Sequence, residues 1–290
     1  MTGPDSRVSV VLITRNRRDE LLANLDRLAR LPERPTVFVV DNASTDGTAA
    51  AVESKFPGVT LIRADRNLGA AGRNLGIRRA ATPYVAVCDD DSWPDPGCLR
   101  HAADRFDACP RLGLVSGRVL VGPEETEDPV CEVMRRSPLP AEPGMPGPPL
   151  LGFMAGASVV RRDAFLSAGG FVDRFRVGGE EELLAIDLAA AGWWVCYDPD
   201  YVVHHHPSPR RDPADRRATL IRNALWAAWL RRSVPGAVRR TVRLARDWPC
   251  DRGTARGVMA ALAGLPWVLR NRRAAPRHVE AGMELLDAGF

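Results

Sequence analysis

The sequence predicts an α/β protein built on a Rossmann-like, mostly parallel mixed sheet that is flanked by helices. Three apolar runs of strand length are each followed by a segment that suits a helix. They span residues 8–13, 36–40 and 59–62. A fourth run, 85–88, leads directly into Asp89-Asp90-Asp91. Repeated strand–helix units need crossover connections, and such connections favour parallel strands.

The first half of the chain carries recognisable start and stop signals for its helices. Leucines at helical spacing predict a first helix, which Pro32 ends. Ser44, Thr45 or Asp46 can cap the second helix. The helices are expected over 19–31, up to about 56, and after the glycine-rich segment 67–76, with a further strand over 112–121.

Residues 122–150 interrupt the alternation of strands and helices. The stretch is rich in proline and acidic residues, and six prolines between 138 and 149 exclude regular structure there. A loop of this length inside a domain is typically a lid or a disordered excursion. Strands or helices are expected again at 151–160, 163–168, 180–191, 193–197 and 201–203.

The end of the chain differs in charge and pattern. The formal net charge is only +4, but eleven arginines against three aspartates lie between Pro207 and Trp248. From residue 216 onward the pattern is helical and amphipathic, so we expect a basic, helical C-terminal extension over 208–290, with Leu220 on its apolar stripe. Such helices suit either packing on the main domain or lying on an anionic membrane surface.

Cysteine usage and hydropathy indicate a cytoplasmic protein. The six cysteines form no C-x-x-C pair, no signal-type segment precedes Arg7, and no apolar run approaches the length of a bilayer. We expect reduced thiols, and peripheral contact with the inner face of a membrane stays open.

Polar clusters stand at the expected carboxyl ends of the strands, where open α/β sheets bind ligands. They are Thr14-Arg15-Asn16-Arg17, Asp41, Arg73-Asn74 and Asp89-Asp90-Asp91. Three adjacent carboxylates repel one another unless they are screened, which favours a cation site over a solvated acidic turn. A nicotinamide site is disfavoured because no G-x-G-x-x-G follows the first strand.

These motifs, taken in order, resemble those of the family 2 glycosyltransferases, which have the GT-A fold. The resemblance covers about residues 7–207. It rests on 8–17, 40–48, 67–69 with 73–76, 89–91, 169–171, 179–181 and the histidines 204–206. It implies a GT-A domain over 1–207, with a donor half (about 1–121), a proline-rich loop (122–150) and an acceptor half (151–207). It also implies inverting transfer from a nucleoside diphosphate sugar with Mg²⁺ or Mn²⁺ as cofactor.

The resemblance also assigns residues that bind the nucleotide sugar. Asp41 would accept a hydrogen bond from the base, and Thr14, Arg15 and Asn16 would line the same pocket. Arg73 would face the nucleotide or its diphosphate, as suits a guanidinium fork. The remaining members of this set are Asn67, Asp89 and Asp90.

For the metal, the resemblance implies Asp91 as the direct ligand, with Asp89 as the other member of the D-x-D pair. His205 stands at the spacing of the family's metal-binding histidine. Strand alternation would place His204 and His206 on the opposite face. Three histidines in a row could instead be a surface feature without a ligand.

The general base would be Glu181, the acidic residue after a glutamate at the start of a helix. The family's usual aspartate is a glutamate here, so Glu180 or Glu182 could take the role. The physical alternative is ordinary helix-start chemistry, because acidic residues are favoured in a first turn.

The implied partners are a sugar donor linked to UDP or dTDP and an acceptor that is a glycan, a lipid-linked molecule or a small molecule. No nucleic acid is expected.

Two alternative functions remain. A nucleotidyltransferase would place a glycine-rich basic loop after the first strand, and 14–17 is basic but lacks glycine. A non-catalytic binder of nucleic acid or membranes would use the arginine-rich helices and show a steep salt dependence.

Overall fold

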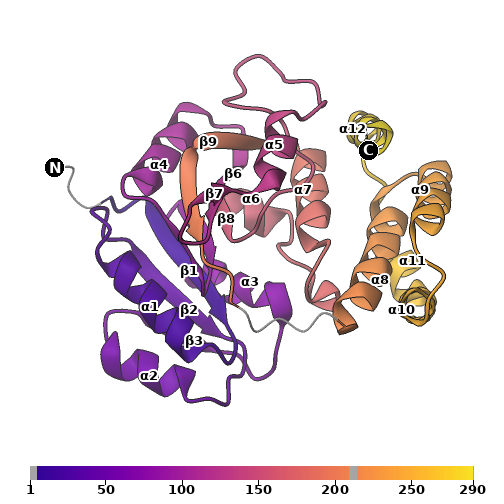
Figure 1. The fold of residues 1–290 in the computed structure, drawn as a ribbon. Helices are drawn as coiled ribbons and strands as arrows, with labels where there is room; N and C mark the ends of the chain where they lie inside the picture. Colours follow the sequence, from indigo (N-terminus) through magenta and orange to yellow (C-terminus); the bar gives the residue numbers. More distant parts are fainter. Residues whose placement is uncertain (1–4, 209–213, 290) are drawn as a thin grey trace.

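The computed structural model describes residues 5–208 and 214–289. Its described part contains one nine-stranded sheet, with α1, α2 and α4 on one face and α3, α6 and α7 on the other (Figure 1). The order of strands along the sheet is β3-β2-β1-β4-β8-β6-β9-β5, and β7 pairs with β6. The predicted α/β class with a mostly parallel mixed sheet is confirmed.

The amino-terminal half of the sheet is parallel. It consists of β3 (Thr60–Arg63), β2 (Thr36–Asp41), β1 (Val8–Thr14) and β4 (Tyr84–Asp89). Most residues of β1 and β4 are buried, which explains their unbroken apolar runs. The register places Thr14 beside Asp41 and Ile13 beside Asp89. The polar strand ends therefore meet at one edge, as the sequence predicts.

The other half of the sheet is mixed. β8 (Ala157–Arg161) runs antiparallel to β4 and to β6 (Leu112–Val121). β9 (Trp194–His205) is parallel to β6, while β5 (Ser92–Pro94) is antiparallel to β9. The predicted strands 193–197 and 201–203 are thus one strand, with a register shift opposite Gly117 and Arg118 between the two predicted segments.

The helices of this domain begin close to where the sequence places them. They are α1 (Arg18–Ala29), α2 (Thr48–Lys55), α3 (Arg73–Arg79), α6 (Arg162–Ser167) and α7 (Glu180–Ala190). A further helix, α4 (Cys98–Ala108), was not predicted. One glycine of the glycine-rich segment lies inside α3 and has a packing reason, because a Cβ at Gly76 would lie 2.5 Å from Cγ1 of Val11. Gly76 lets α3 pack directly on β1.

The segment 122–150 is more regular than a lid or a disordered excursion. It contains β7 (Thr126–Glu127) and α5 (Pro129–Arg135), and Asp128 caps α5 by accepting a hydrogen bond from the amide of Val130. Aspartate followed by proline is a common helix start, and Cys131 of α5 is fully buried. The proline-rich part has no helix, yet it is tied to β9 through the amide of Leu150.

Five helices follow the sheet domain. They are α8 (Ala214–Arg231), α9 (Val234–Asp247), α10 (Arg252–Ala263), α11 (Leu265–Asn271) and α12 (Arg277–Ala288). They gather beside α7 (Figure 1), and Trp226 of α8 packs with Phe175 and Leu183 next to the sheet domain. Leu220, expected on the apolar stripe, is 41% exposed, whereas its neighbour Ile221 is buried.

The helical character of the extension is confirmed, while the boundary at 207/208 stays a prediction. Arg210 and Arg211, which count toward the basic stretch, lie outside the described residues. Among the described helices, none combines the length and the apolar composition needed to cross a bilayer.

Asn223 of α8 links the extension to the loop that precedes α7. Its side chain is buried, and its Nδ2 donates hydrogen bonds to three carbonyl oxygens of that loop. These belong to Phe175 (2.8 Å), Val177 (3.3 Å) and Gly178 (2.5 Å). The side-chain amide of Asn223 thus provides a donor for loop carbonyl oxygens that form no hydrogen bonds of a helix or sheet.

We predict that Asn223→Ala lowers the free energy of unfolding by about 1–3 kcal/mol, because buried carbonyls lose their donor. Urea denaturation followed by tryptophan fluorescence measures this change. Asn271→Ala is the matched control, since the exposed Asn271 side chain bonds only within its own helical turn. Its cost should stay within ~0.5 kcal/mol, and equal losses in both variants would contradict the role of Asn223.

Candidate active site

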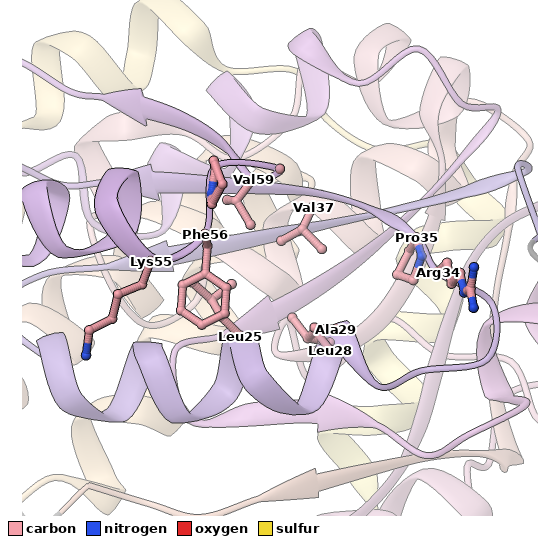
Figure 2. Close-up of a pocket in the computed structure, with 11 residues that line it drawn as sticks. Leu25, Leu28, Ala29, Arg34, Pro35, Val37, Lys55, Phe56 and Val59 are labelled. Carbon is pink, nitrogen blue, oxygen red and sulfur yellow. The ribbon is translucent and has the colours of Figure 1, made fainter.

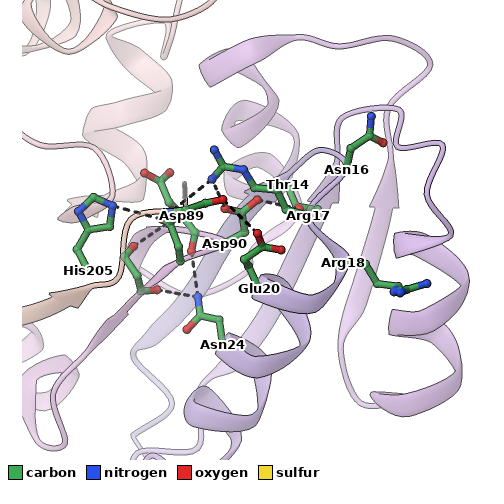
Figure 3. Close-up of polar contacts among 12 residues, drawn as sticks. Thr14, Asn16, Arg17, Arg18, Glu20, Asn24, Asp89, Asp90 and His205 are labelled. Carbon is green, nitrogen blue, oxygen red and sulfur yellow. Dashed lines mark hydrogen bonds and ion pairs between the residues drawn. The ribbon is translucent and has the colours of Figure 1, made fainter. Parts of the chain in front are cut away.

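The carboxyl ends of β1 and β4 bring Thr14 and the three aspartates together (Figure 3). Thr14 Oγ1 donates to Asp90 Oδ2 at 2.9 Å. Arg17 Nη1 donates to Asp90 Oδ1 at 2.9 Å and to Asp91 Oδ2 at 3.3 Å. One guanidinium therefore bridges two adjacent carboxylates and offsets their mutual repulsion.

Asp90 is turned inward. Burial raises its pKa to about 6, although Arg17 opposes that rise. Since its oxygens are engaged by Thr14 and Arg17, Asp90 holds the strand ends together. Its predicted contact with a nucleotide sugar stays a prediction.

Asp91 faces the end of β9. Its Oδ1 lies 3.4 Å from Nε2 of His205, and its Oδ2 accepts a hydrogen bond from the amide of Ser208 at 3.2 Å. Burial alone would raise the pKa of Asp91, but His205, Ser208 and Arg17 together hold it below its ordinary value. Asp91 is therefore a buried carboxylate that stays ionised and has a histidine nitrogen beside it.

Asp89 lies with a different cation. It forms an ion pair with Arg73, a nearly buried side chain at the start of α3. The backbone of this turn is fixed by Asn24, whose Nδ2 donates to the carbonyl oxygens of Asp89 (3.0 Å) and Ser92 (2.8 Å). Thus the structure pairs Asp91 with His205 and Asp89 with Arg73, and it does not gather all three predicted metal ligands around one point.

The sequence does not indicate Asn24 as a member of the site, and it names Arg17 within a polar cluster without giving its partners. Asn24 stands among the leucines of α1, and only a polar residue within an apolar stripe signals it. Arg17 belongs to the basic run after β1, but nothing in that run says which arginine turns toward the aspartates.

The remaining residues predicted to bind the nucleotide lie in the loops after β1 and β2. The Asn16 side chain accepts a hydrogen bond from the amide of Thr45 at 2.8 Å, while Arg15 is exposed. Asp41 is only 4% exposed and accepts from the amide of Ser44 at 3.1 Å. Asp41 is thus largely buried in this structure, and its predicted hydrogen bond to a nucleotide base stays a prediction.

Asn67 and the loop before α3 lie at the same edge of the sheet. Asn67 Oδ1 accepts a hydrogen bond from the amide of Gly69 at 2.9 Å. Asn42, next to Asp41, donates to the carbonyl of Gly69 at 3.1 Å. The loop is thereby tied to the end of β2.

The three glutamates at the start of α7 have different surroundings. Glu180 is 3% exposed, and burial together with Glu181 raises its pKa to about 8. Burial also raises the pKa of Glu181, which is partly exposed and lies in the field of Arg73 and Asp89.

Glu182 belongs to another environment. Burial raises its pKa, and the charges that act on it are those of Arg240, Arg232 and Asp287 in the C-terminal helices. Of the three glutamates, Glu180 and Glu181 therefore share the site of Arg73 and Asp89, and Glu182 does not.

The histidines at the end of β9 alternate as predicted. His204 stacks on Trp93 with ring centroids 5.4 Å apart, and it lies between Asp95 (3.2 Å) and Glu125 (3.0 Å). His206 meets the edge of the same tryptophan, whereas His205 faces Asp91. The stacking holds the end of β9 against β5 and so fixes the direction of His205.

A second cluster of possible metal ligands lies between α4 and β9. His101, Asp198 and Asp200 offer ligand atoms within 4.8 Å of one another, the one such group found in the part of the chain that the structure describes. Arg105 already lies 3.2 Å from Asp198 and 3.6 Å from Asp200. Its guanidinium offsets the negative charge that a cation would otherwise neutralise.

A surface groove of about 430 Å³ lies between α1 and the turn from α2 to β3 (Figure 2). Leu25, Leu28, Val37 and Phe56 give it an apolar floor. None of the predicted site residues lines it, so the groove is separate from the carboxyl edge of the sheet.

Comparison with known proteins gives a consistent result. The family model described as "Glycosyl transferase family 2" matches residues 9–167. The N-acetylglucosaminyl-diphospho-decaprenol L-rhamnosyltransferase of Mycobacterium tuberculosis is 29% identical over 249 residues, which cover 72% of this chain and 80% of the relative. An uncharacterized glycosyltransferase of the same organism is 33% identical over 197 residues, which cover 65% of this chain and 81% of the relative.

Two solved structures share the fold. The mannosyltransferase PcManGT from Pyrobaculum calidifontis, in complex with GDP-Man and Mn²⁺, has a TM-score of 0.59 at 22% identity, covering 98% of this chain and 76% of its own. S. aureus TarS 1-349 in complex with UDP-GlcNAc has a TM-score of 0.61 at 15% identity, and the match covers 91% of this chain and 79% of the TarS chain. These likenesses confirm the predicted GT-A arrangement.

The raised pKa of Glu180 predicts a pH-dependent stability. Between the ordinary value of 4.5 and about 8 the folded state holds more protons than the unfolded state, so the free energy of unfolding falls as pH rises through this window. Glu180→Gln removes this proton uptake. We expect its stability relative to the unmodified protein to increase steadily from pH 5 to pH 8 in urea titrations. Glu124→Gln, at an exposed glutamate, should follow the unmodified protein, and a Glu180→Gln curve that does the same would refute the raised pKa.

Proposed function

The chain belongs to glycosyl transferase family 2, and from this premise we propose a metal-dependent, inverting transfer of a sugar from a nucleoside diphosphate sugar to an acceptor hydroxyl. Family membership makes the protein a glycosyltransferase. The finer proposal is supported chiefly by one observation. A single edge of the sheet holds an ionised aspartate beside a histidine, an arginine facing an exposed aspartate, and glutamates of raised pKa.

The donor would lie across the loops that follow β1, β2 and β4. PcManGT is known in complex with GDP-Man and TarS with UDP-GlcNAc, and both share this fold. We propose UDP- and dTDP-linked sugars as the first donors to test. Thr14, Arg15, Asn16, Asp41 and Asn67 would surround the nucleotide, with Asp89 and Asp90 next to the sugar-diphosphate.

Arg73 is well placed to meet the diphosphate. Its guanidinium is nearly buried and is held by Asp89, whose carboxylate is about one-third exposed. A guanidinium fork matches phosphate oxygens and stays charged at any working pH. On donor binding, Arg73 would exchange part of its contact with Asp89 for the phosphate.

The chain also offers donors that suit a divalent cation. Asp91 Oδ1 and His205 Nε2 are 3.4 Å apart, close to the ~3 Å between neighbouring ligands of an octahedral ion with bonds of about 2.1 Å. The carboxylate oxygen suits Mn²⁺ or Mg²⁺, and the imidazole nitrogen beside it favours Mn²⁺, because Mg²⁺ prefers oxygen ligands. Asp89 of the same turn would add an oxygen once its ion pair with Arg73 is exchanged for the diphosphate. When bound, the ion would supply neutralisation of the charge that develops on the departing diphosphate.

The general base is proposed to be Glu181. It is partly exposed, unlike Glu180, and it lies in the field of Arg73 and Asp89, unlike Glu182. Its raised pKa favours proton uptake from an acceptor hydroxyl that attacks the anomeric carbon from the face opposite the diphosphate. Glu180, buried behind it, would keep its own proton and so avoid a second negative charge in the site.

The acceptor is proposed to be lipid-linked. The mycobacterial relative is named for a rhamnosyl transfer to N-acetylglucosaminyl-diphospho-decaprenol. A glycan or a small molecule would be the alternative. We propose a cytoplasmic location, supported by six cysteines that are all free thiols.

The base assignment predicts that Glu181→Gln lowers transfer by about 10²–10⁴-fold, because the acceptor proton loses its carrier. Donor affinity, measured by calorimetry with UDP- and dTDP-sugars, should change little. The assay would use N-acetylglucosaminyl-diphospho-decaprenol as acceptor. Glu182→Gln is the matched control and should remain active. Full activity of Glu181→Gln together with loss of activity in Glu180→Gln would contradict this assignment and make Glu180 the general base.

The metal assignment predicts that Asp91→Asn weakens Mn²⁺ binding by at least about tenfold, as measured by electron paramagnetic resonance of free Mn²⁺. Asp198→Asn tests the rival group at α4 and β9 and should leave the affinity unchanged. The opposite pattern would place the ion at His101, Asp198 and Asp200. Removal of the metal with EDTA should abolish transfer in the unmodified enzyme.

A further inference from the structure

The five C-terminal helices carry most of the exposed apolar surface of this protein. Among the described residues, eight of the eleven large apolar side chains that are exposed lie in α8–α12, although these helices are a minority of the chain. The same segment is strongly basic, with fifteen arginines and six acidic residues between 214 and 290. Because the whole chain carries only +4, the remainder is net negative.

The helix α9 shows this combination most clearly. Val234, Val238 and Val242 follow one another at four-residue spacing, so they share one face of the helix. They are 55%, 46% and 45% exposed. The opposite face packs inward through Ala237 and Leu244, which are buried. The valine stripe is therefore an apolar face of α9 that the described part of the chain leaves uncovered.

A row of arginines borders this stripe. Arg239, Arg243 and Arg246 recur at spacings of four and three residues and so form a second stripe next to the valines. Arg239 pairs with Glu284, but within the described residues neither Arg243 nor Arg246 forms an ion pair. An apolar face flanked by arginines is the pattern of a helix that lies in the interface of an anionic bilayer.

We propose that the valine stripe of α9, with Arg243 and Arg246 beside it, docks this enzyme on an anionic lipid surface. The arginines decide between a bilayer and a second copy of this chain. A second copy would bring a second basic surface against the first, and these like charges repel. An anionic bilayer instead accepts both the apolar stripe and the charge.

A series of ion pairs between helices connects the docking surface to the candidate active site. Arg232, directly after α8, and Arg240 of α9 both pair with Asp287 of α12. The helix α8 in turn binds α7 through Arg231 and Asp187, and α7 begins with Glu180 and Glu181. In Figure 1, α9 lies at the outer side of this group, away from the sheet. This purpose of the surface rests on the proposed lipid-linked acceptor, which would stay in the bilayer while its head group is glycosylated.

The test is co-sedimentation of the full chain with vesicles of phosphatidylglycerol and phosphatidylcholine in equal parts. Val238→Ser with Val242→Ser, and separately Arg243→Gln with Arg246→Gln, should each lower the partition coefficient roughly tenfold. The matched control is Val130→Ser with Val133→Ser on α5, where the exposed fractions are 44% and 47%. Partition of the control should not change, and the unmodified protein should release from the vesicles in high salt.

Three outcomes would overturn the proposal: equal partition of all variants, equal binding to pure phosphatidylcholine vesicles, or a monomer–dimer shift on sedimentation without lipid that only the α9 variants abolish. Circular dichroism checks that each variant is folded. Hydrolysis of the donor sugar in the absence of vesicles provides a separate readout. It should be the same in the α9 variants as in the unmodified protein. If no nucleotide sugar is hydrolysed by any form, the proposed function fails while vesicle binding is still decided.

Discussion

The fold depends on how the negative charge at the end of β4 is compensated. Asp89, Asp90 and Asp91 follow one another in a tight turn, and each finds a different cationic or polar partner. Arg17, in the loop after β1, pairs with Asp90 and Asp91. Arg73, at the start of α3, pairs with Asp89. The compensation also adds a side-chain contact between the turn after β4 and the end of β9, because His205 lies beside Asp91.

The helix α7 lies between the carboxyl edge of the sheet and the C-terminal helices. In its first turn, Glu180 and Glu181 lie in the field of Arg73 and Asp89. Glu182 instead lies in the field of arginines of the C-terminal extension. Consecutive residues of a helix point in different directions, so one acidic triplet serves two environments. The first turn of α7 therefore lies between the charges of Arg73 and Asp89 and those of the C-terminal helices.

Much of this arrangement follows from local sequence, and the exceptions have physical causes. Apolar runs that end in polar residues predicted β1, β2 and β4, and alternation along β9 predicted that His205 lies on the face opposite His204 and His206. The direction of Arg17 and the role of Asn24 could not be predicted, because both depend on how α1 packs beneath the aspartate turn. Helix α5 was missed because the proline density of 138–149 obscured the start signal at Asp128.

The hydrogen bonds of Asn223 have a consequence for how this chain can be divided. The extension covers Phe175 and Leu183 and holds the carbonyls of the loop that leads into α7. A fragment that stopped at the end of β9 would therefore expose apolar surface and free the glutamate turn, even though every strand would still be present. The C-terminal helices are therefore part of the same packed unit as the loop that leads into α7.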